Sequence, residues 1–245
     1  MDDARFTADD HYFHGDYLTA QRANDDAAEA LAHCDLAPGG LILDGGCGDG
    51  RLALRLAALG YRVTAVDHDA AQLQRLNDQM TDGADTLTVI EASLESFVAP
   101  EPFDAALLWF TTWGFLSDSA NHAVLKSMRN ALIPGGVLVI DTLNPVAVER
   151  YVAVHPEPVV TIRGGNRQVD RYSFDRSTRR LTDVRDVSLH GSTSTRTLSL
   201  SLPSREEWTT NLSDVGLELA NVAARRGKEF TTDSWEMVLI ARRID

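Results

Sequence analysis

Short apolar runs alternate with helix-like segments between residues 41 and 141. Each apolar run has the length of a strand, and apolar residues recur three or four positions apart in the segments between the runs. The expected strands are 41–43, 61–66, 86–90, 104–109 and 137–140. Strands that alternate with helices pair in parallel and are covered on both faces. This stretch therefore predicts an α/β fold around a parallel sheet.

The pattern changes between residues 158 and 202, where short strands are separated by turns and no helix is expected. Leu198, Leu200 and Leu202 alternate with serines, which is typical of a strand with one buried and one solvent-facing side. We therefore expect an antiparallel β insertion in this part of the chain.

The C-terminal part begins with a helix signal. Ser204 and Glu207 form a capping-box pattern at the start of an expected helix, and Gly216 marks its end. Two further strands are expected at about 217–224 and 235–242.

Composition limits the class of protein and its partners. The chain has 245 residues, of which 44% are hydrophobic and 24% charged, as in ordinary globular proteins. The net charge of −13 disfavours a nucleic-acid partner, because an acidic surface repels phosphate backbones. No apolar run approaches the roughly 18 residues of a membrane helix, and the N-terminus shows no signal-peptide pattern. The two cysteines, Cys34 and Cys47, cannot form a disulfide framework, so we expect a cytoplasmic protein without a membrane partner.

A glycine loop follows the first strand and leads into a helix. Such a loop lets the backbone approach a ligand closely, and Asp67, at the end of the next strand, can accept hydrogen bonds from both ribose hydroxyls. Dinucleotide loops read G-x-G-x-x-G, but here the glycines are Gly46, Gly48 and Gly50, and Arg51 follows. These residues indicate a ligand that contains adenosine, and their spacing disfavours a dinucleotide.

Four motifs in this order resemble those of class I S-adenosylmethionine-dependent methyltransferases. They are 43–50 (LDGGCGDG), 66–67 (VD), 103–109 (FDAALLW) and 132–138 (LIPGGVL). The β insertion makes the arrangement similar to small-molecule methyltransferases such as bacterial amino-sugar N-methyltransferases. The resemblance implies a Rossmann-like, seven-stranded, mostly parallel sheet with helices on both faces, completed by the two C-terminal strands as an antiparallel pair. It also implies S-adenosylmethionine as cofactor and S-adenosylhomocysteine as product.

The resemblance assigns cofactor contacts to the first two motifs. The backbone of Gly46 and Gly48 would pass beneath the methionine part of the cofactor, and Asp44 would help to hold its ammonium group. Asp67 would bind the ribose hydroxyls, and the neighbouring His68 would lie near the adenine.

Two later segments complete the implied cofactor site. Ser93 and Leu94 occupy the place of the motif that contacts the edge of the adenine. Family members often carry Asp where this chain has Ser93, whose hydroxyl can still accept a hydrogen bond. Trp109 would lie near the sulfonium, which an aromatic face attracts by about 0.5–2 kcal/mol. Ordinary core burial is the alternative for Trp109.

The N-terminal segment 1–38 is expected to be a lid with helices. In related small-molecule methyltransferases a segment before the first strand covers the cofactor. By this resemblance Tyr12 and Tyr17 would shield the sulfonium, and Arg22 would pair with the carboxylate of the cofactor.

Histidines supply the candidates for proton transfer. His14 is a candidate general base, and His122 is a second one. His11 and His14 lie three residues apart near two aspartates, but no clear further ligand accompanies them, so no metal is expected.

The segment after the fourth strand suggests the acceptor site. Trp113 and Phe115 would form a wall for a small organic acceptor, with burial under the lid as the alternative. The pattern Asn/Asp-Pro-Pro-aromatic of amino methyltransferases that act on adenine or glutamine is missing there. No Asp closes the fourth strand, so a magnesium-dependent catechol-type site is not supported. The expected partner is a small metabolite that is methylated on nitrogen or oxygen.

The insertion carries four arginines on an otherwise acidic protein. They are Arg163, Arg167, Arg171 and Arg176. This basic face would either receive an anionic acceptor or be a solvated strand face. The insertion itself would cover the acceptor site or form a dimer contact, so both a monomer and a homodimer remain open.

Together these features predict a single methyltransferase domain over residues 1–245. Its parts are the N-terminal lid and helices (1–38), the cofactor-binding core (39–145), the antiparallel insertion (155–203) and the C-terminal helix and strands (204–245). Two other functions stay open. One is a nicotinamide-dependent oxidoreductase, although neither a glycine at position 51 nor a catalytic Tyr/Lys pair is seen. The other is a non-catalytic sensor of an adenosine-containing ligand.

Overall fold

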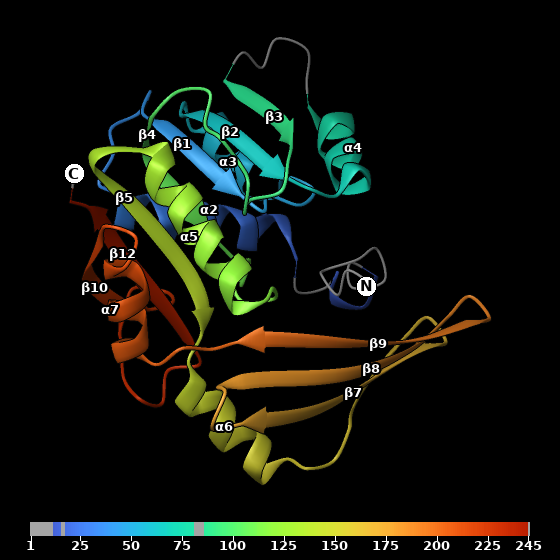
Figure 1. Cartoon of the computed structure of the whole chain (residues 1–245). Coiled ribbons are helices and arrows are strands. Elements are labelled where there is room, and N and C mark those ends of the chain that lie inside the picture. Colours follow the sequence, from blue (N-terminus) through green and yellow to red (C-terminus); the bar gives the residue numbers. More distant parts are fainter. Residues whose placement is uncertain (1–11, 16–17, 81–85, 245) are drawn as a thin grey trace.

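The computed structural model describes residues 12–15, 18–80 and 86–244. Its larger sheet has the strand order β11-β10-β12-β5-β4-β1-β2-β3 (Figure 1). The strands are β1 Leu41–Gly45, β2 Arg62–Asp67, β3 Leu87–Glu91, β4 Phe103–Leu108, β5 Leu132–Leu143, β10 Leu217–Ala224, β11 Lys228–Glu229 and β12 Glu236–Arg243. β1 to β5 pair in parallel, whereas β12 is antiparallel to both β5 and β10. The predicted α/β fold class is confirmed, with the short β11 added at one edge.

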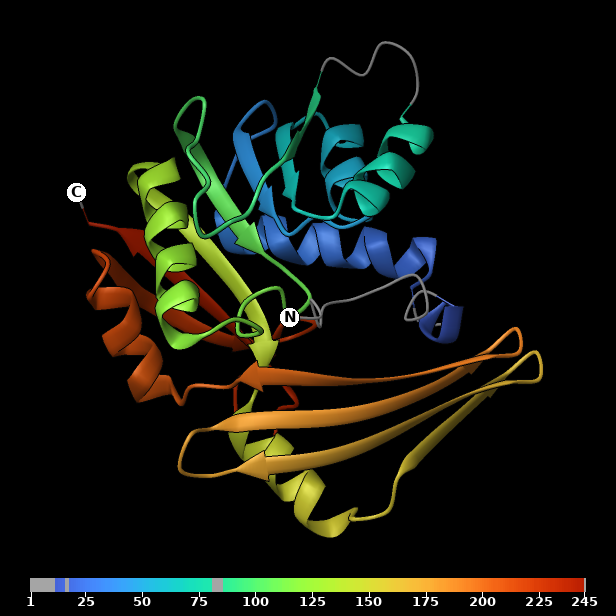
Figure 2. The same ribbon diagram turned by 45° about the vertical axis from the view of Figure 1, so that its right-hand side comes forward.

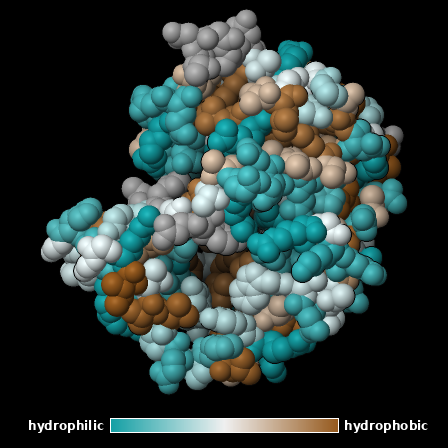
Figure 3. All heavy atoms as spheres, turned by 180° about the vertical axis from the view of Figure 1, so that it is seen from behind, coloured by the Kyte–Doolittle hydropathy of each residue, from teal (hydrophilic) through white to brown (hydrophobic). Residues whose placement is uncertain are grey.

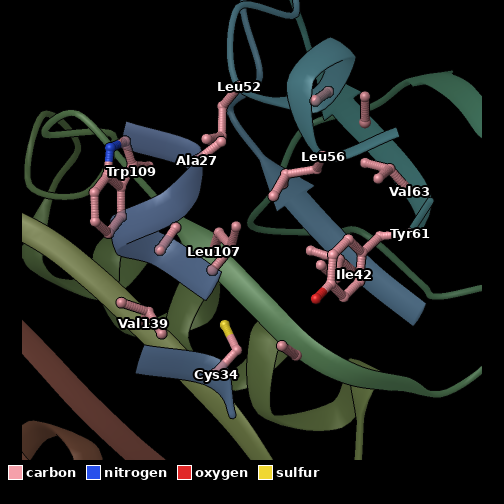
Figure 4. Packing of buried hydrophobic residues seen from close by; sticks show 14 of the residues in the cluster. Ala27, Cys34, Ile42, Leu52, Leu56, Tyr61, Val63, Leu107, Trp109 and Val139 are labelled. Atoms are coloured by element: carbon pink, nitrogen blue, oxygen red, sulfur yellow. The ribbon is translucent and has the colours of Figure 1, made fainter. Parts of the chain in front are cut away.

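Helices cover both faces of this sheet. They are α2 Ala20–Cys34, α3 Ala53–Ala58, α4 Ala70–Gln79, α5 Asp118–Ala131 and α7 Arg205–Ser213, whereas α6 Pro145–Val154 packs on the second sheet described below. α2, α3 and α4 pack on one face, where Ile42 of β1 and Leu56 of α3 belong to the same buried cluster (Figure 4). α5 and α7 pack on the other face, to which the next residue of β1, Leu43, points because side chains alternate along a strand. None of the described helices has both the length and the apolar character needed to cross a membrane.

β5 is longer than the sequence pattern predicts. It begins at Leu132, so the Pro-Gly-Gly run at 134–136 lies inside the strand, and Leu132 does not belong to the preceding helix. The pairing of β5 with β4 shifts its register between Phe103 and Ala105. An irregularity of this kind lets a strand accommodate extra residues without losing the rest of the ladder.

Helical spacing of apolar residues does not indicate α6. Asn144 caps this helix, since its side-chain oxygen accepts a hydrogen bond from the Val146 N–H at 3.1 Å. Pro145 follows at the first helical position, where a missing N–H removes no helical hydrogen bond. The dipeptide Asn-Pro was therefore the available signal for this helix.

The predicted antiparallel insertion is confirmed as a second sheet with the order β6-β7-β8-β9. Its strands are β6 Val159–Arg163, β7 Asn166–Asp175, β8 Arg180–Leu189 and β9 Ser192–Ser201. In both ribbon views this sheet lies across the carboxyl end of β5 and extends below α2 (Figures 1 and 2). One end of it is anchored by a small apolar cluster that joins Val148 of α6 to Leu200 of β9.

Candidate active site

A cavity of about 1400 Å³ lies at the carboxyl ends of β1, β2 and β4. At one end it is lined by the glycine loop, and at the other by Arg185 and Leu198 of the antiparallel sheet. We call these the glycine-loop end and the sheet end. Seen from behind, the molecular surface is hollowed where the antiparallel sheet meets the rest of the protein (Figure 3). Since ligand pockets usually hold about 300–1,000 Å³, this cavity has room for two small molecules.

The glycine loop shapes the first end through its backbone. Gly46 has a φ of +71°, and a Cβ there would lie 2.3 Å from Cγ2 of Thr112. Gly48 has a φ of +56°, but a Cβ there would meet no described atom within 4 Å. Gly46 is therefore required by the packing of the protein itself, whereas Gly48 opens the cavity and lets a ligand approach the backbone.

Asp67 ends β2 and is buried beside the loop. Its Oδ2 accepts the Gly48 N–H at 2.9 Å, and its Oδ1 accepts the Asp69 N–H at 2.9 Å and lies 3.1 Å from Nδ1 of His68. Burial alone would raise the pKa of Asp67, but the hydrogen bonds from His68, Asp69 and Gly48 hold it below its usual value. Asp67 is thus an ionised carboxylate at the cavity wall, with further lone pairs for the hydroxyls of a ligand.

Asp44 ends the first strand in a different state. It is 2% exposed and lines the cavity, yet none of the described residues makes a hydrogen bond to its Oδ2. Burial raises the pKa of Asp44 to about 7, although the guanidinium of Arg51 opposes the shift. A buried carboxylate oxygen without a partner is costly unless a ligand supplies one, and a cationic group is the partner that suits it best.

The other residues predicted around the adenine also lie at this end. His68, Ser93 and Leu94 all line the cavity. Their contacts with a cofactor remain predictions.

The loop after β4 forms the wall opposite the glycines. Trp109 belongs to the same buried cluster as Ile42 and Leu56 (Figure 4), and it also lines the cavity. The two alternatives for Trp109, core burial and a place in the site, are therefore compatible. The next two residues, Phe110 and Thr111, have φ values of +60° and +58°, which side chains rarely adopt. Both are held by Asp141 of β5, whose Oδ2 accepts the Phe110 N–H and whose backbone carbonyl accepts the Thr111 N–H, each at 3.0 Å.

A buried ion-pair network fixes this wall to the helix that covers it. Arg225, directly after β10, donates to Asp141 at 2.7 Å, to Glu29 of α2 at 2.8 Å and to Asp26 of α2. Asp26 also accepts a hydrogen bond from Arg51, beside the glycine loop, at 2.5 Å. The Arg225 guanidinium lies 4.5 Å above the ring of Trp109. This ion-pair network therefore connects α2, the loop after β4 and Arg51 beside the glycine loop.

The two aromatic residues predicted for the acceptor both line the cavity. Trp113 is also a core residue, because its ring lies 4.4 Å from that of Trp208 and its Nε1 donates to the Asn121 carbonyl at 2.9 Å. Phe115 is partly buried against the apolar cluster at the foot of the antiparallel sheet. Both side chains are thus held from behind, as a rigid wall requires.

The N-terminal candidates are spread over different places. His14 lines the cavity. Tyr12 packs on the antiparallel sheet, where its hydroxyl donates to the Arg163 carbonyl at 2.9 Å. Arg22 forms an ion pair with Asp26 at 3.9 Å, and neither it nor Tyr12 is among the residues that line the cavity. Tyr17 lies outside the described residues, as does His11.

The sequence reasoning missed several residues that shape the cavity. They are Arg51, Thr112, Asp141, Arg185, Leu198 and Arg225. Asp141 directly follows the predicted fifth strand (137–140), which was a usable signal, because ligands bind at the carboxyl ends of parallel strands. Neither Arg185 nor Arg225 stands in a motif. Within the described part of the chain, no cluster of three or more His, Cys, Asp or Glu residues could hold a metal ion.

Comparison with known protein families gives a match in the same region. Residues 42–136 match the model of a family described as a methyltransferase domain. Over 122 residues the chain is 32% identical to the ubiquinone biosynthesis O-methyltransferase of Xanthomonas campestris pv. campestris (strain B100). That alignment covers 48% of each protein, so the chain spans about half the length of the curated relatives it matches.

Solved structures match over nearly the whole chain. The CcbJ methyltransferase from Streptomyces caelestis has a TM-score of 0.76 at 21% identity and covers 90% of both chains. CalS10, an amino pentose methyltransferase from Micromonospora echinaspora solved with S-adenosylmethionine bound, has a TM-score of 0.67 at 19% identity over 99% of both chains. At this level of identity the likeness establishes the fold alone.

Proposed function

Since residues 42–136 carry a methyltransferase domain, as the four motifs predicted, we propose that this protein is an S-adenosylmethionine-dependent methyltransferase acting on a small metabolite. The observation that carries the proposal is the pair of carboxylates around the opening at Gly48. Asp44 presents a buried oxygen that lacks a partner among the described residues, and Asp67 presents an ionised carboxylate one strand away.

These residues fit the cofactor group by group. Asp44 would hold the ammonium of its methionine part, and the open space at Gly48 would admit that part against the backbone. Asp67 would accept the ribose hydroxyls, with His68, Ser93 and Leu94 around the adenine. Trp109 would face the sulfonium. Tyr12 and Tyr17 would shield the sulfonium, and Arg22 of α2 would pair with the carboxylate of the cofactor.

Methyl transfer requires the protein mainly to position the donor and the acceptor. When bound, S-adenosylmethionine supplies a methyl group on a sulfonium sulfur, and the acceptor lone pair attacks the methyl carbon while the carbon–sulfur bond breaks. The residues of this chain bind the two partners in line and exclude water. Trp113 and Phe115 would form the wall beside the acceptor, and His14 would take the proton that the acceptor releases.

The acceptor atom is nitrogen or oxygen. An O-methyltransferase among the relatives and a sugar N-methyltransferase, KedS8, among the structural neighbours support these two atoms. We propose that the protein needs no metal for this reaction, since displacement at a sulfonium uses a leaving group that is already activated.

The test is transfer of a labelled methyl group from S-adenosylmethionine to a panel of small amines and alcohols. Formation of a labelled acceptor together with S-adenosylhomocysteine is the expected result. Tight binding of the donor with no transfer to any member of the panel would favour the sensor function instead.

A further inference from the structure

The ladder between β4 and β5 ends at the edge of the cavity. Its last pair joins Leu108 to Ile140. Beyond this pair β4 stops and the chain bends, whereas β5 continues to Leu143. The bend comprises residues 109–112, all of which line the cavity, and we call it the wall bend. It connects the place proposed for the cofactor to Trp113 in the wall proposed beside the acceptor.

The two central residues of the wall bend have a costly backbone conformation. Phe110 and Thr111 have φ values of +60° and +58°. L-residues avoid this left-handed region because Cβ then comes too close to the following carbonyl oxygen, and a β-branched residue such as Thr111 is an outlier there. Two such residues in succession persist only where the surrounding contacts hold them.

Asp141 of β5 supplies these contacts. It follows Ile140, so it bonds to the bend in place of a further pair of the ladder. Its Oδ2 accepts the Phe110 N–H and its backbone carbonyl accepts the Thr111 N–H, each at 3.0 Å. One residue therefore holds both strained positions, the first through its side chain and the second through its backbone.

The carboxylate of Asp141 is itself fixed in place. Its side chain is buried, and its Oδ2 also accepts a hydrogen bond from Nη1 of Arg225 at 2.7 Å. Burial raises the pKa of Asp141 to about 6, although the Arg225 guanidinium opposes the shift, so the carboxylate is ionised at pH 8. An ionised acceptor forms a stronger hydrogen bond than a neutral one, which suits a contact that opposes backbone strain.

The wall bend packs directly on the glycine loop. The Oγ1 of Thr112 donates to the Trp109 carbonyl at 2.8 Å, which closes the bend. The Cγ2 of Thr112 would lie only 2.3 Å from a Cβ on Gly46. On the other side, the guanidinium of Arg51 lies 5.1 Å from the ring centroid of Phe110. Relaxation of the bend to a right-handed conformation would therefore move Thr112 relative to Gly46 and change the shape of the glycine-loop end.

We propose that Asp141 is a positioning residue of this site, which holds the wall bend in its left-handed conformation and thereby keeps the glycine-loop end in the shape that binds the methyl donor. Asp141 is not among the residues that line the cavity, so it acts through the bend and not by touching a ligand. The inference rests on the proposed function, because it takes the glycine-loop end as the place of the cofactor.

A double-mutant cycle separates this role from a general loss of stability. Asp141→Ala removes the side-chain acceptor, and Thr111→Gly introduces a residue that adopts a positive φ without steric cost. The dissociation constant of S-adenosylhomocysteine is measured by calorimetry at pH 8 for the wild type, both single variants and the double variant. The quantity compared is the factor by which Asp141→Ala weakens binding in each background.

We expect Asp141→Ala to weaken binding about tenfold in the wild-type background, since the cost of a residue in the left-handed region corresponds to roughly that factor. In the Thr111→Gly background the same substitution should weaken binding less than about threefold, because the bend is then held against a smaller cost. An unchanged affinity in Asp141→Ala, or a loss in the glycine background as large as in the wild type, would overturn the proposal.

Asp35 provides the matched control background. It is exposed, has a φ of +54° at the end of α2 and is not among the residues that line the cavity. Asp35→Gly therefore also replaces a side chain at a positive φ, and Asp141→Ala should weaken binding by the same factor there as in the wild type. A smaller factor in this background too would mean that added stability, and not the bend, restores binding, and it would overturn the proposal.

A conservative variant tests the hydrogen bond itself. Asp141→Asn keeps an oxygen that can accept the Phe110 N–H, so it should bind S-adenosylhomocysteine more tightly than Asp141→Ala does. Equal losses in the two variants would contradict the proposed contact. If Asp141→Ala does not fold, Asp141→Leu takes its place in the cycle, since it fills the buried space and also lacks an acceptor.

The wild-type titration distinguishes the two proposals. Failure of the wild-type protein to bind S-adenosylhomocysteine would contradict the proposed function. Normal binding by the wild type, together with an equal effect of Asp141→Ala in all backgrounds, would contradict this inference alone.

Discussion

The two ends of the cavity are built by different means. At the glycine-loop end, the shape comes from backbone conformation, namely the positive φ values of Gly46 and Gly48 and the N–H groups that Asp67 accepts. At the sheet end, it comes from side chains on neighbouring antiparallel strands, among which Arg185 meets Asp170 across the ladder. The glycine-loop end therefore depends on backbone geometry, whereas the sheet end depends on which side chains its strands carry. The proposed cofactor site lies at the first of these two ends.

The largest expected effect comes from breaking the charge network behind the glycine-loop end. Arg225→Met would leave Asp26, Glu29 and Asp141 buried without their shared cation, and we expect a loss of about 3–5 kcal/mol in the free energy of unfolding. Urea denaturation measures it. Arg176→Met removes the ion pair of an arginine side chain that is 78% exposed, and should change stability by less than about 1 kcal/mol. Equal losses in the two variants would show that the network does not hold the wall.

Filling the opening in the glycine loop comes next. Gly48→Val would place a side chain where the cofactor is proposed to lie, so S-adenosylhomocysteine should bind more than about 100-fold more weakly, a loss of roughly 2.7 kcal/mol or more in calorimetry. Gly135→Val is the control, because Gly135 also has a positive φ and open space around it but does not line the cavity. Normal binding by Gly48→Val would mean that the ligand lies elsewhere.

Removing the ribose contact tests a single side chain of the same end. Asp67→Ala should weaken binding of S-adenosylhomocysteine by about 1–3 kcal/mol, since hydrogen bonds to a carboxylate are lost. Asp78→Ala, on the exposed side of α4, should leave the affinity unchanged. The same affinity for Asp67→Ala and the wild type would remove the ribose assignment.

The smallest effect is a dependence of binding on pH. The carboxyl of Asp44 has a pKa of about 7 because of burial, and a cationic ammonium prefers its ionised form. Affinity for S-adenosylhomocysteine should therefore rise as the pH rises through 7, by up to about tenfold between pH 6 and pH 8, as protons are released on binding. Calorimetry in buffers of different ionisation enthalpy measures those protons. Asp44→Asn should bind more weakly and lose this pH dependence, and a variant that kept it would place the titrating group elsewhere.

The difference between the two ends of the cavity also explains which of its residues could be predicted from the sequence. Gly46, Gly48 and Asp67 follow strands in a recurrent order, so their place at the carboxyl ends of parallel strands could be predicted, and the structure puts all three beside one cavity. Arg185 could not be found in this way. Its place at the cavity wall depends on which face of β8 is buried and on a register with β7 that no motif encodes.

Arg225 illustrates a second limit. It follows the last residue of β10 and lies 199 positions from Asp26 along the chain, yet the two form one ion pair. Such contacts depend on the pairing of β12 with β5 and of β10 with β12. The sequence pattern does not specify this pairing. Similarly, no motif indicates that the hydroxyl of Tyr12 donates a hydrogen bond to the backbone carbonyl of Arg163, 151 positions away in the antiparallel sheet.

The most direct test of the account is a calorimetric titration of the wild-type protein with S-adenosylhomocysteine, and of a second sample with NAD. The account predicts binding of the first at one site per chain and no binding of the second. Saturation at 100 times the dissociation constant should also stabilise the fold by about 2.7 kcal/mol. Binding of NAD without binding of S-adenosylhomocysteine would contradict the cofactor assignment and would favour an oxidoreductase.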